Sequence, residues 1–79
     1  MTAAEPKPLC ERIGQRVRER REGLRLSRAR LGAMTELSRV ALWQIEQGQS
    51  EPMASTILRL CRVLGCSADW LLGVNEETP

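Results

Sequence analysis

The residues best equipped to bind a partner lie between Ser38 and Gly48. If this segment is helical, with about 100° per residue, Ala41, Leu42 and Ile45 fall on one side. The opposite side carries one arginine, one valine, an indole and two amides: Arg39, Val40, Trp43, Gln44 and Gln47. Guanidinium and amide groups bind planar polar partners through paired hydrogen bonds, whereas an ordinary solvated face is the alternative interpretation. The composition favours a contact surface.

Catalytic and metal-binding residues are poorly represented. The chain has no histidine, and Cys10, Cys61 and Cys66 follow no metal-ligand spacing. No glycine-rich phosphate loop and no pair of nucleophile and base can be named. We therefore expect no enzyme activity, no cofactor and no metal, and three reduced thiols that pack as small apolar side chains.

Positive charge is concentrated in one part of the sequence. Eight arginines and two glutamates between Arg12 and Arg30 give that stretch a net charge of +6, although the whole chain carries only +2. From Gln49 onward the balance is −2. A compact basic face attracts a polyanion, most often nucleic acid, although individual residues such as Arg12, Arg16 and Arg20 are expected to be solvated.

Two helices are predicted in this basic half. Leu9, Ile13 and Val17 recur every four residues, which predicts a helix from about Leu9 to Leu24. Ser27 can cap a second, short helix that extends to about Met34. Gly32 in that helix has no side chain and would let another helix cross close to it.

Three further helices are predicted in the second half. The contact segment begins after Ser38 and extends to about Gln47, and Gly48 ends it. The stripe Ile57, Leu60, Cys61 and Leu64 marks a fourth helix, which ends at Gly65, and Ser67 can cap a fifth helix over Ala68–Leu72 that Gly73 closes. The fold class is therefore all-α, one compact five-helix domain over residues 9–73 with flexible tails at 1–8 and 74–79.

The segment from Ser27 to Gly48 (SRARLGAMTELSRVALWQIEQG) resembles the lambda-repressor-like, or Xre, helix-turn-helix family. The family pattern is approximately S-Q-x-x-L-A-x-x-x-G-V-S-x-x-x-I-x-x-I-E-x-G, and the match has no gaps. The resemblance extends to Arg18 and Arg21 upstream and to Asp69-Trp70-Leu71-Leu72 downstream. Arg28, Gly32 and Glu36 depart from it, replacing glutamine, alanine and the turn glycine. A positive φ is disfavoured for a residue other than glycine, so the turn geometry at Glu36 stays open.

The resemblance implies a role for each group of matched residues. The start of the second helix would bind phosphate through Arg28, and Ser38, Arg39, Val40 and Gln44 at the start of the third helix would reach base edges in the major groove. Ser27 and Gln47 are further expected DNA-binding residues. Trp43 lies on the same face, and its contact with DNA bases, with a sugar or with a protein partner stays open. It also implies a structural ion pair between Arg21 and Glu46 and a homodimer formed through the C-terminal helices, with Trp70, Leu71 and Leu72 as apolar contacts.

The expected function is a sequence-specific DNA-binding transcriptional regulator, a repressor, that binds a pseudo-palindromic operator as a dimer. The alternative is an antitoxin-type protein-interaction module that also binds DNA, although the short tails offer little chain to sequester a protein partner. With no apolar run near the ~18 residues of a membrane span and no signal-peptide pattern, we expect a cytoplasmic protein without membrane contact.

Overall fold

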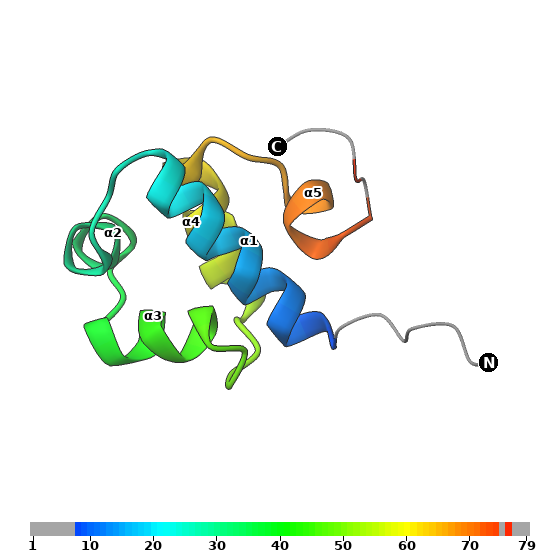
Figure 1. Cartoon of the computed structure of the whole chain (residues 1–79), viewed down its shortest axis with the longest axis horizontal. Helices are drawn as coiled ribbons and strands as arrows, with labels where there is room; N and C mark the ends of the chain where they lie inside the picture. Colours follow the sequence, from blue (N-terminus) through cyan, green and yellow to red (C-terminus); the bar gives the residue numbers. More distant parts are fainter. Residues whose placement is uncertain (1–7, 75, 77–79) are drawn as a thin grey trace.

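Five α-helices follow one another along the chain, and short turns join them (Figure 1). The computed structural model describes residues 8–74 and residue 76, and no strand forms among them. The helices are α1 (Leu9–Gly23), α2 (Arg28–Thr35), α3 (Arg39–Glu46), α4 (Ala54–Leu64) and α5 (Ala68–Leu72). The predicted all-α fold is confirmed, and the helix ends that were predicted differ from the observed ones by at most one residue. The start of α4, three residues before its apolar stripe, was not predicted.

Serine side chains begin three of the helices. Ser27, Ser38 and Ser67 precede α2, α3 and α5, and each Oγ accepts a hydrogen bond of 3.0 Å from the backbone N–H three residues later. Each bond satisfies a donor that the first helical turn would otherwise leave unpaired. The three predicted caps are therefore confirmed.

α1 lies at the centre of the fold and packs against α3, α4 and α5. Figure 1 shows α2 and α3 toward one end of α1 and α5 toward the other. The apolar stripes predicted from the sequence meet in one core, whose fully or nearly fully buried members are Ile13, Val17, Leu31, Leu42, Ile45, Ile57, Leu60, Cys61, Leu64 and Leu71. Leu71 is 0% exposed, so the prediction that it contacts a second subunit is wrong, because its side chain is already covered within one chain.

Two glycines allow close backbone approaches. A Cβ on Gly14 would collide with the carbonyl oxygen of Ile45, so α1 and α3 cross here with almost no space between their backbones. The sequence interpretation missed this position. At Gly32, where a crossing helix was expected, a Cβ would lie 2.7 Å from the carbonyl oxygen of Leu37 in the turn before α3. The close neighbour of Gly32 is thus the turn and not another helix.

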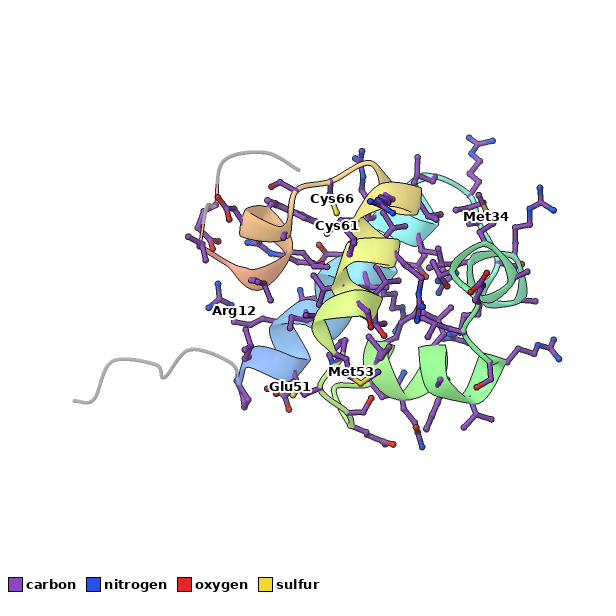
Figure 2. The ribbon with its side chains drawn as sticks, turned by 180° about the vertical axis from the view of Figure 1, so that it is seen from behind. Arg12, Met34, Glu51, Met53, Cys61 and Cys66 are labelled. Carbon is purple, nitrogen blue, oxygen red and sulfur yellow. The ribbon has the colours of Figure 1, made fainter. Side chains whose placement is uncertain are left out.

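Cys61 and Cys66 lie together at the end of α4 (Figure 2). Gly65 takes the left-handed conformation with φ 66°, and the Cys66 N–H donates to the Cys61 carbonyl at 3.1 Å, as in a Schellman C-cap. Burial, together with the neighbouring Cys66 thiol, raises the pKa of Cys61 to about 12. Burial also raises the pKa of Cys66. Both thiols are therefore protonated near neutral pH and act as packing groups.

The end of the chain contacts α1 within the described residues. The Glu76 carboxylate accepts hydrogen bonds from Arg12 at 3.0 Å and from Arg16 at 2.6 Å. The exposed Glu76 thus meets two arginines of α1, while the flexible tail predicted over 74–79 stays a prediction. Residue 75, residues 77–79 and all but the last residue of the predicted N-terminal tail, 1–8, lie outside the described residues.

The described helices are all too short or too polar to cross a lipid bilayer.

Candidate nucleic-acid interface

α2 and α3 form a helix-turn-helix unit whose turn depends on one left-handed residue. Glu36 has φ 60° and ψ 32°, so the turn takes the left-handed geometry although a glutamate occupies it. The Leu37 N–H donates to the Gly32 carbonyl at 2.8 Å, and the buried Thr35 hydroxyl donates to the Leu31 carbonyl at 2.7 Å. These bonds hold Glu36 in a conformation that is otherwise costly for a residue with a Cβ.

The predicted division of α3 into two faces is confirmed. Leu42 and Ile45 are buried in the core. Val40 is 64% exposed and Trp43 is 42% exposed, and the polar members of the same face are exposed as well: Arg39, Gln44 and Gln47. An outward valine and indole on so short a helix gain nothing from the core, so this face is available to a partner.

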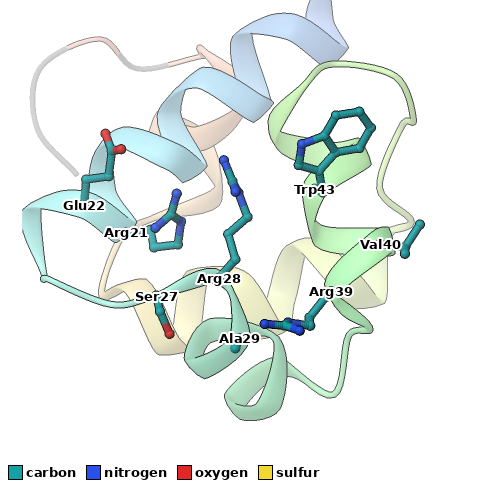
Figure 3. A pocket seen from close by; sticks show the side chains of 8 residues that line it. All are labelled: Arg21, Glu22, Ser27, Arg28, Ala29, Arg39, Val40 and Trp43. Atoms are coloured by element: carbon teal, nitrogen blue, oxygen red, sulfur yellow. The ribbon is translucent and has the colours of Figure 1, made fainter.

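An open concavity of about 820 Å³ lies between α2 and α3. Its lining comes from three helices and the cap of α2 (Figure 3): Arg21, Glu22, Ser27, Arg28, Ala29, Arg39, Val40 and Trp43. Figure 3 shows Arg39 pointing from the start of α3 toward Ala29 on α2. The fold thus brings together five of the predicted DNA-binding residues: Ser27, Arg28, Arg39, Val40 and Trp43.

The other three predicted residues lie outside this concavity. Ser38 caps α3, and Gln44 is exposed on the same helix. Gln47 lines a smaller polar depression of about 260 Å³ with Glu11, Gln15, Arg18 and Glu46. The outward face of α3 therefore extends from the concavity to the start of α1.

A buried carboxylate joins all three helices of this region. Glu46 Oε2 accepts from Arg21 Nε at 2.7 Å, and Glu46 Oε1 accepts from Arg21 Nη2 at 3.0 Å. The Glu46 side chain is 0% exposed and that of Arg21 is 9% exposed, so the predicted ion pair is confirmed and is buried. Its hydrogen bonds with Glu46 raise the pKa of Arg21, although burial acts in the opposite direction.

Arg28 is a third member of this cluster, which the sequence interpretation did not anticipate. Its Nε donates to Glu46 Oε1 at 3.0 Å, while its side chain remains 38% exposed. In the view of Figure 3, Arg28 extends between Arg21 and Trp43. Only the departure from the family's usual glutamine at this position could have drawn attention to it.

Other arginines of α1 are occupied inside the domain, so the expectation that they are solvated is wrong for Arg16 and Arg20. Arg16 donates to the Trp70 carbonyl, and its guanidinium lies 4.7 Å from the centre of the Trp70 ring. Arg20 donates to the Leu64 carbonyl at 2.8 Å, at the end of α4. A signal existed in the sequence, because Arg12, Arg16 and Arg20 recur every four residues beside the buried stripe.

A second, apolar groove of about 480 Å³ lies on another part of the surface. Its lining is Leu9, Ile13, Glu51, Pro52, Ala54, Ile57, Leu58, Ala68 and Leu72. Leu72, one of the predicted dimer contacts, is half-buried there, whereas Trp70 lies half-buried under Arg16. Leu9 and Leu58 are 44% and 50% exposed, so this groove adds apolar surface that the sequence interpretation did not include.

Similarity to known proteins extends over most of the chain. Residues 17–71 match the model of a family described as helix-turn-helix. Over 60 residues the chain is 42% identical to Repressor protein C2 of Salmonella phage P22, covering 76% of this chain and 28% of that protein. Over 65 residues it is 37% identical to HTH-type transcriptional regulator DicA of Escherichia coli (strain K12), covering 82% of this chain and 48% of DicA. The chain thus spans less than half the length of these curated relatives.

Solved structures are similar in fold as well. The P22 c2 repressor in complex with a synthetic operator superposes with a TM-score of 0.76 at 40% identity, covering 80% of this chain and 96% of that one. The restriction-modification controller protein C.AhdI from Aeromonas hydrophila superposes with a TM-score of 0.74 at 31% identity, covering 78% and 94%.

Proposed function

This chain belongs to the helix-turn-helix family, and on that premise we propose that it is a transcriptional regulator that binds double-stranded DNA with α3 in the major groove. One observation carries the proposal: three side chains of the outward face of α3 and the arginine at the start of α2 line the same open concavity. A protein similar to this chain, the P22 c2 repressor, is in complex with a synthetic operator. Repressor protein C2 is a repressor by name, so repression is the direction we propose here too.

Each exposed side chain of α3 would recognise a different feature of the bases. The fork of Arg39 matches the two acceptors of guanine, and the amide of Gln44 matches the donor and acceptor of adenine. Val40 would pack on a thymine methyl group, and the indole of Trp43 would cover sugar or base edges beside it. Arg28 would contact phosphate, which carries no sequence information.

Binding to DNA and sequence recognition are tested separately. Selection of bound duplexes from random DNA identifies the preferred site, and Arg39→Ala should cost ~1 to 3 kcal/mol on it and much less on random duplexes. Arg28→Ala should weaken both equally and lower the salt slope by ~1. Variants and duplexes are compared with one another at the same salt concentration, because counterion release would otherwise imitate a specific contact, and the salt slope comes from a separate series of salt concentrations. Equal losses on both duplexes would assign Arg39 to the DNA backbone.

We further propose that two copies bind a pseudo-palindromic site. A single domain of this size contacts few bases, and a two-fold dimer doubles the contacts while it covers apolar surface. With Leu71 excluded, the exposed apolar residues beside Leu72 are the better candidates, chiefly Leu9 and Leu58. Sedimentation should show dimers on DNA, and Leu58→Asp should yield monomers. A wild-type monomer both free and on DNA would contradict the proposal.

A cytoplasmic location and the absence of enzyme activity stay predictions.

A further inference from the structure

Glu46 binds two arginines whose surroundings differ. Both of its oxygens accept hydrogen bonds from Arg21, which is buried, and Oε1 accepts a third bond from Arg28, which is 38% exposed. Arg21 alone satisfies the charge of the buried carboxylate. The cluster of one acid and two guanidinium groups is left with one positive charge in excess, and Arg28 presents it at the concavity.

The bond from Nε determines where the rest of the Arg28 guanidinium points. Nε is the guanidinium nitrogen bonded to the aliphatic part of the side chain, and it is this atom that donates to Glu46 Oε1 at 3.0 Å. The two terminal nitrogens make no hydrogen bond among residues 8–74 and 76 of the structure. Because the guanidinium is planar and rigid, fixing one N–H fixes the direction of the other donors.

We propose that Glu46 is a positioning residue for DNA binding, which holds Arg28 from inside the domain so that both terminal nitrogens face an incoming phosphate. The inference rests on the proposed function. The phosphate binds the terminal nitrogens while Glu46 keeps Nε, so no bond within the protein has to break. Glu46 belongs to α3 and Arg28 to α2. The same carboxylate therefore fixes the position of the phosphate contact relative to the outward face of α3.

The effect of removing the charge of Glu46 on DNA affinity distinguishes positioning from the other roles that a glutamate near DNA can have. Removing a negative charge from a DNA-binding face ordinarily strengthens binding, because the acid repels phosphate. An acid that competed with DNA for Arg28 would act in the same direction. Positioning predicts the reverse, since Arg28 without its anchor must lose side-chain freedom when it binds phosphate.

The test compares Glu46→Gln with Glu22→Gln on a labelled duplex of mixed sequence, because a phosphate contact needs no operator. Glu22 lines the same concavity but is exposed, and within residues 8–74 and 76 its ion pair is with the exposed Arg18 at 3.4 Å, so its variant reports mainly the effect of charge. Affinities are measured at one salt concentration and at a temperature where circular dichroism shows every variant folded. We expect Glu22→Gln to bind at least as tightly as wild type and Glu46→Gln to bind about two- to tenfold more weakly, the size of one net hydrogen bond.

A double-mutant cycle separates positioning from loss of structure. In an Arg28→Ala background, Glu46→Gln should weaken binding no further, because the residue through which it acts is gone. An equal loss in both backgrounds would overturn the inference, as would Glu46→Gln binding as tightly as wild type or more tightly.

A variant that leaves the Arg21–Glu46 pair intact keeps the inference testable if Glu46→Gln does not fold. Arg28→Lys retains the charge, so the salt slope should stay the same, but lysine lacks the fork and the affinity should fall by about two- to tenfold. Wild-type affinity in Arg28→Lys would overturn the inference. If wild type itself bound no duplex, the proposed function would fail and this inference with it, whereas wild-type binding with unaffected variants would refute only the inference.

Discussion

Arg21→Met should be among the most destabilising single substitutions in this domain. It removes two of the three hydrogen bonds that the Glu46 carboxylate accepts and leaves a side chain with 0% exposure without its buried cation. Stranding one member of a buried ion pair costs ~3–5 kcal/mol. Because Arg28 retains one bond to the same carboxylate, we expect the lower end of this range, about 3 kcal/mol.

The predicted loss is large relative to the stability of the whole domain. A chain of 79 residues at roughly 0.05–0.15 kcal/mol per residue is stable by about 4–12 kcal/mol. At about 4–8 °C per kcal/mol for a domain of this size, Arg21→Met should lower the Tm by roughly 10–25 °C. Thermal and urea unfolding followed by circular dichroism measure both quantities, and an unchanged m-value would show that the unfolded state is comparable.

Two matched variants test the reasoning as well as the number. Arg18→Met removes an exposed pair with Glu22 at 3.4 Å and should cost no more than about 0.5 kcal/mol. Combining Arg21→Met with Glu46→Leu should recover much of the loss, because a hydrophobic pair of similar volume can replace a buried ion pair. If the free energies of unfolding of Arg21→Met and Arg18→Met differed by less than about 0.5 kcal/mol, burial of the Glu46 carboxylate would not explain the importance of the Arg21–Glu46 pair.

Three further predictions concern the backbone and the thiols. Because φ is 60° at residue 36, Glu36→Gly should be as stable as wild type or more stable by up to ~1 kcal/mol, and Glu36→Val should be less stable. Urea midpoints in the reverse order would contradict the left-handed turn. Gly14→Ala should cost ~1–3 kcal/mol in the same assay, because its Cβ would meet the Ile45 carbonyl, and a neutral outcome would mean that α1 and α3 can separate freely. Burial raises the pKa of Cys61 to about 12, so the folded state disfavours the Cys61 thiolate. The stabilisation that comes from keeping this thiol protonated is complete below the unfolded thiol's pKa of about 8.5 and is lost as pH rises toward 12. Stability should therefore fall less steeply above pH ~8.5 in Cys61→Ala than in wild type, and parallel pH profiles would argue against it.

The sequence by itself determined the helices and the division of α3 into two faces. Apolar residues at helical spacing define which side of a helix is buried, and a serine before each short helix satisfies a backbone donor locally. Neither feature depends on distant parts of the chain, so Leu42 and Ile45 could be assigned to the core and Val40 and Trp43 to the outside. The Arg21–Glu46 pair was also predicted, although only through the resemblance to a family.

The tertiary structure alone decided which charged and apolar side chains remain available to a partner. Arg28, Arg16 and Arg20 look alike in sequence, yet one lies at an open concavity, and the other two bind carbonyls of α5 and α4. Leu71 likewise follows Trp70 in an apolar run, but the packing of α5 turns it fully into the core. The physical reason is the same in each case: a side chain's exposure depends on which distant helix crosses its own. Periodicity along one helix shows which side faces the core, but not which distant group each side chain on its border meets.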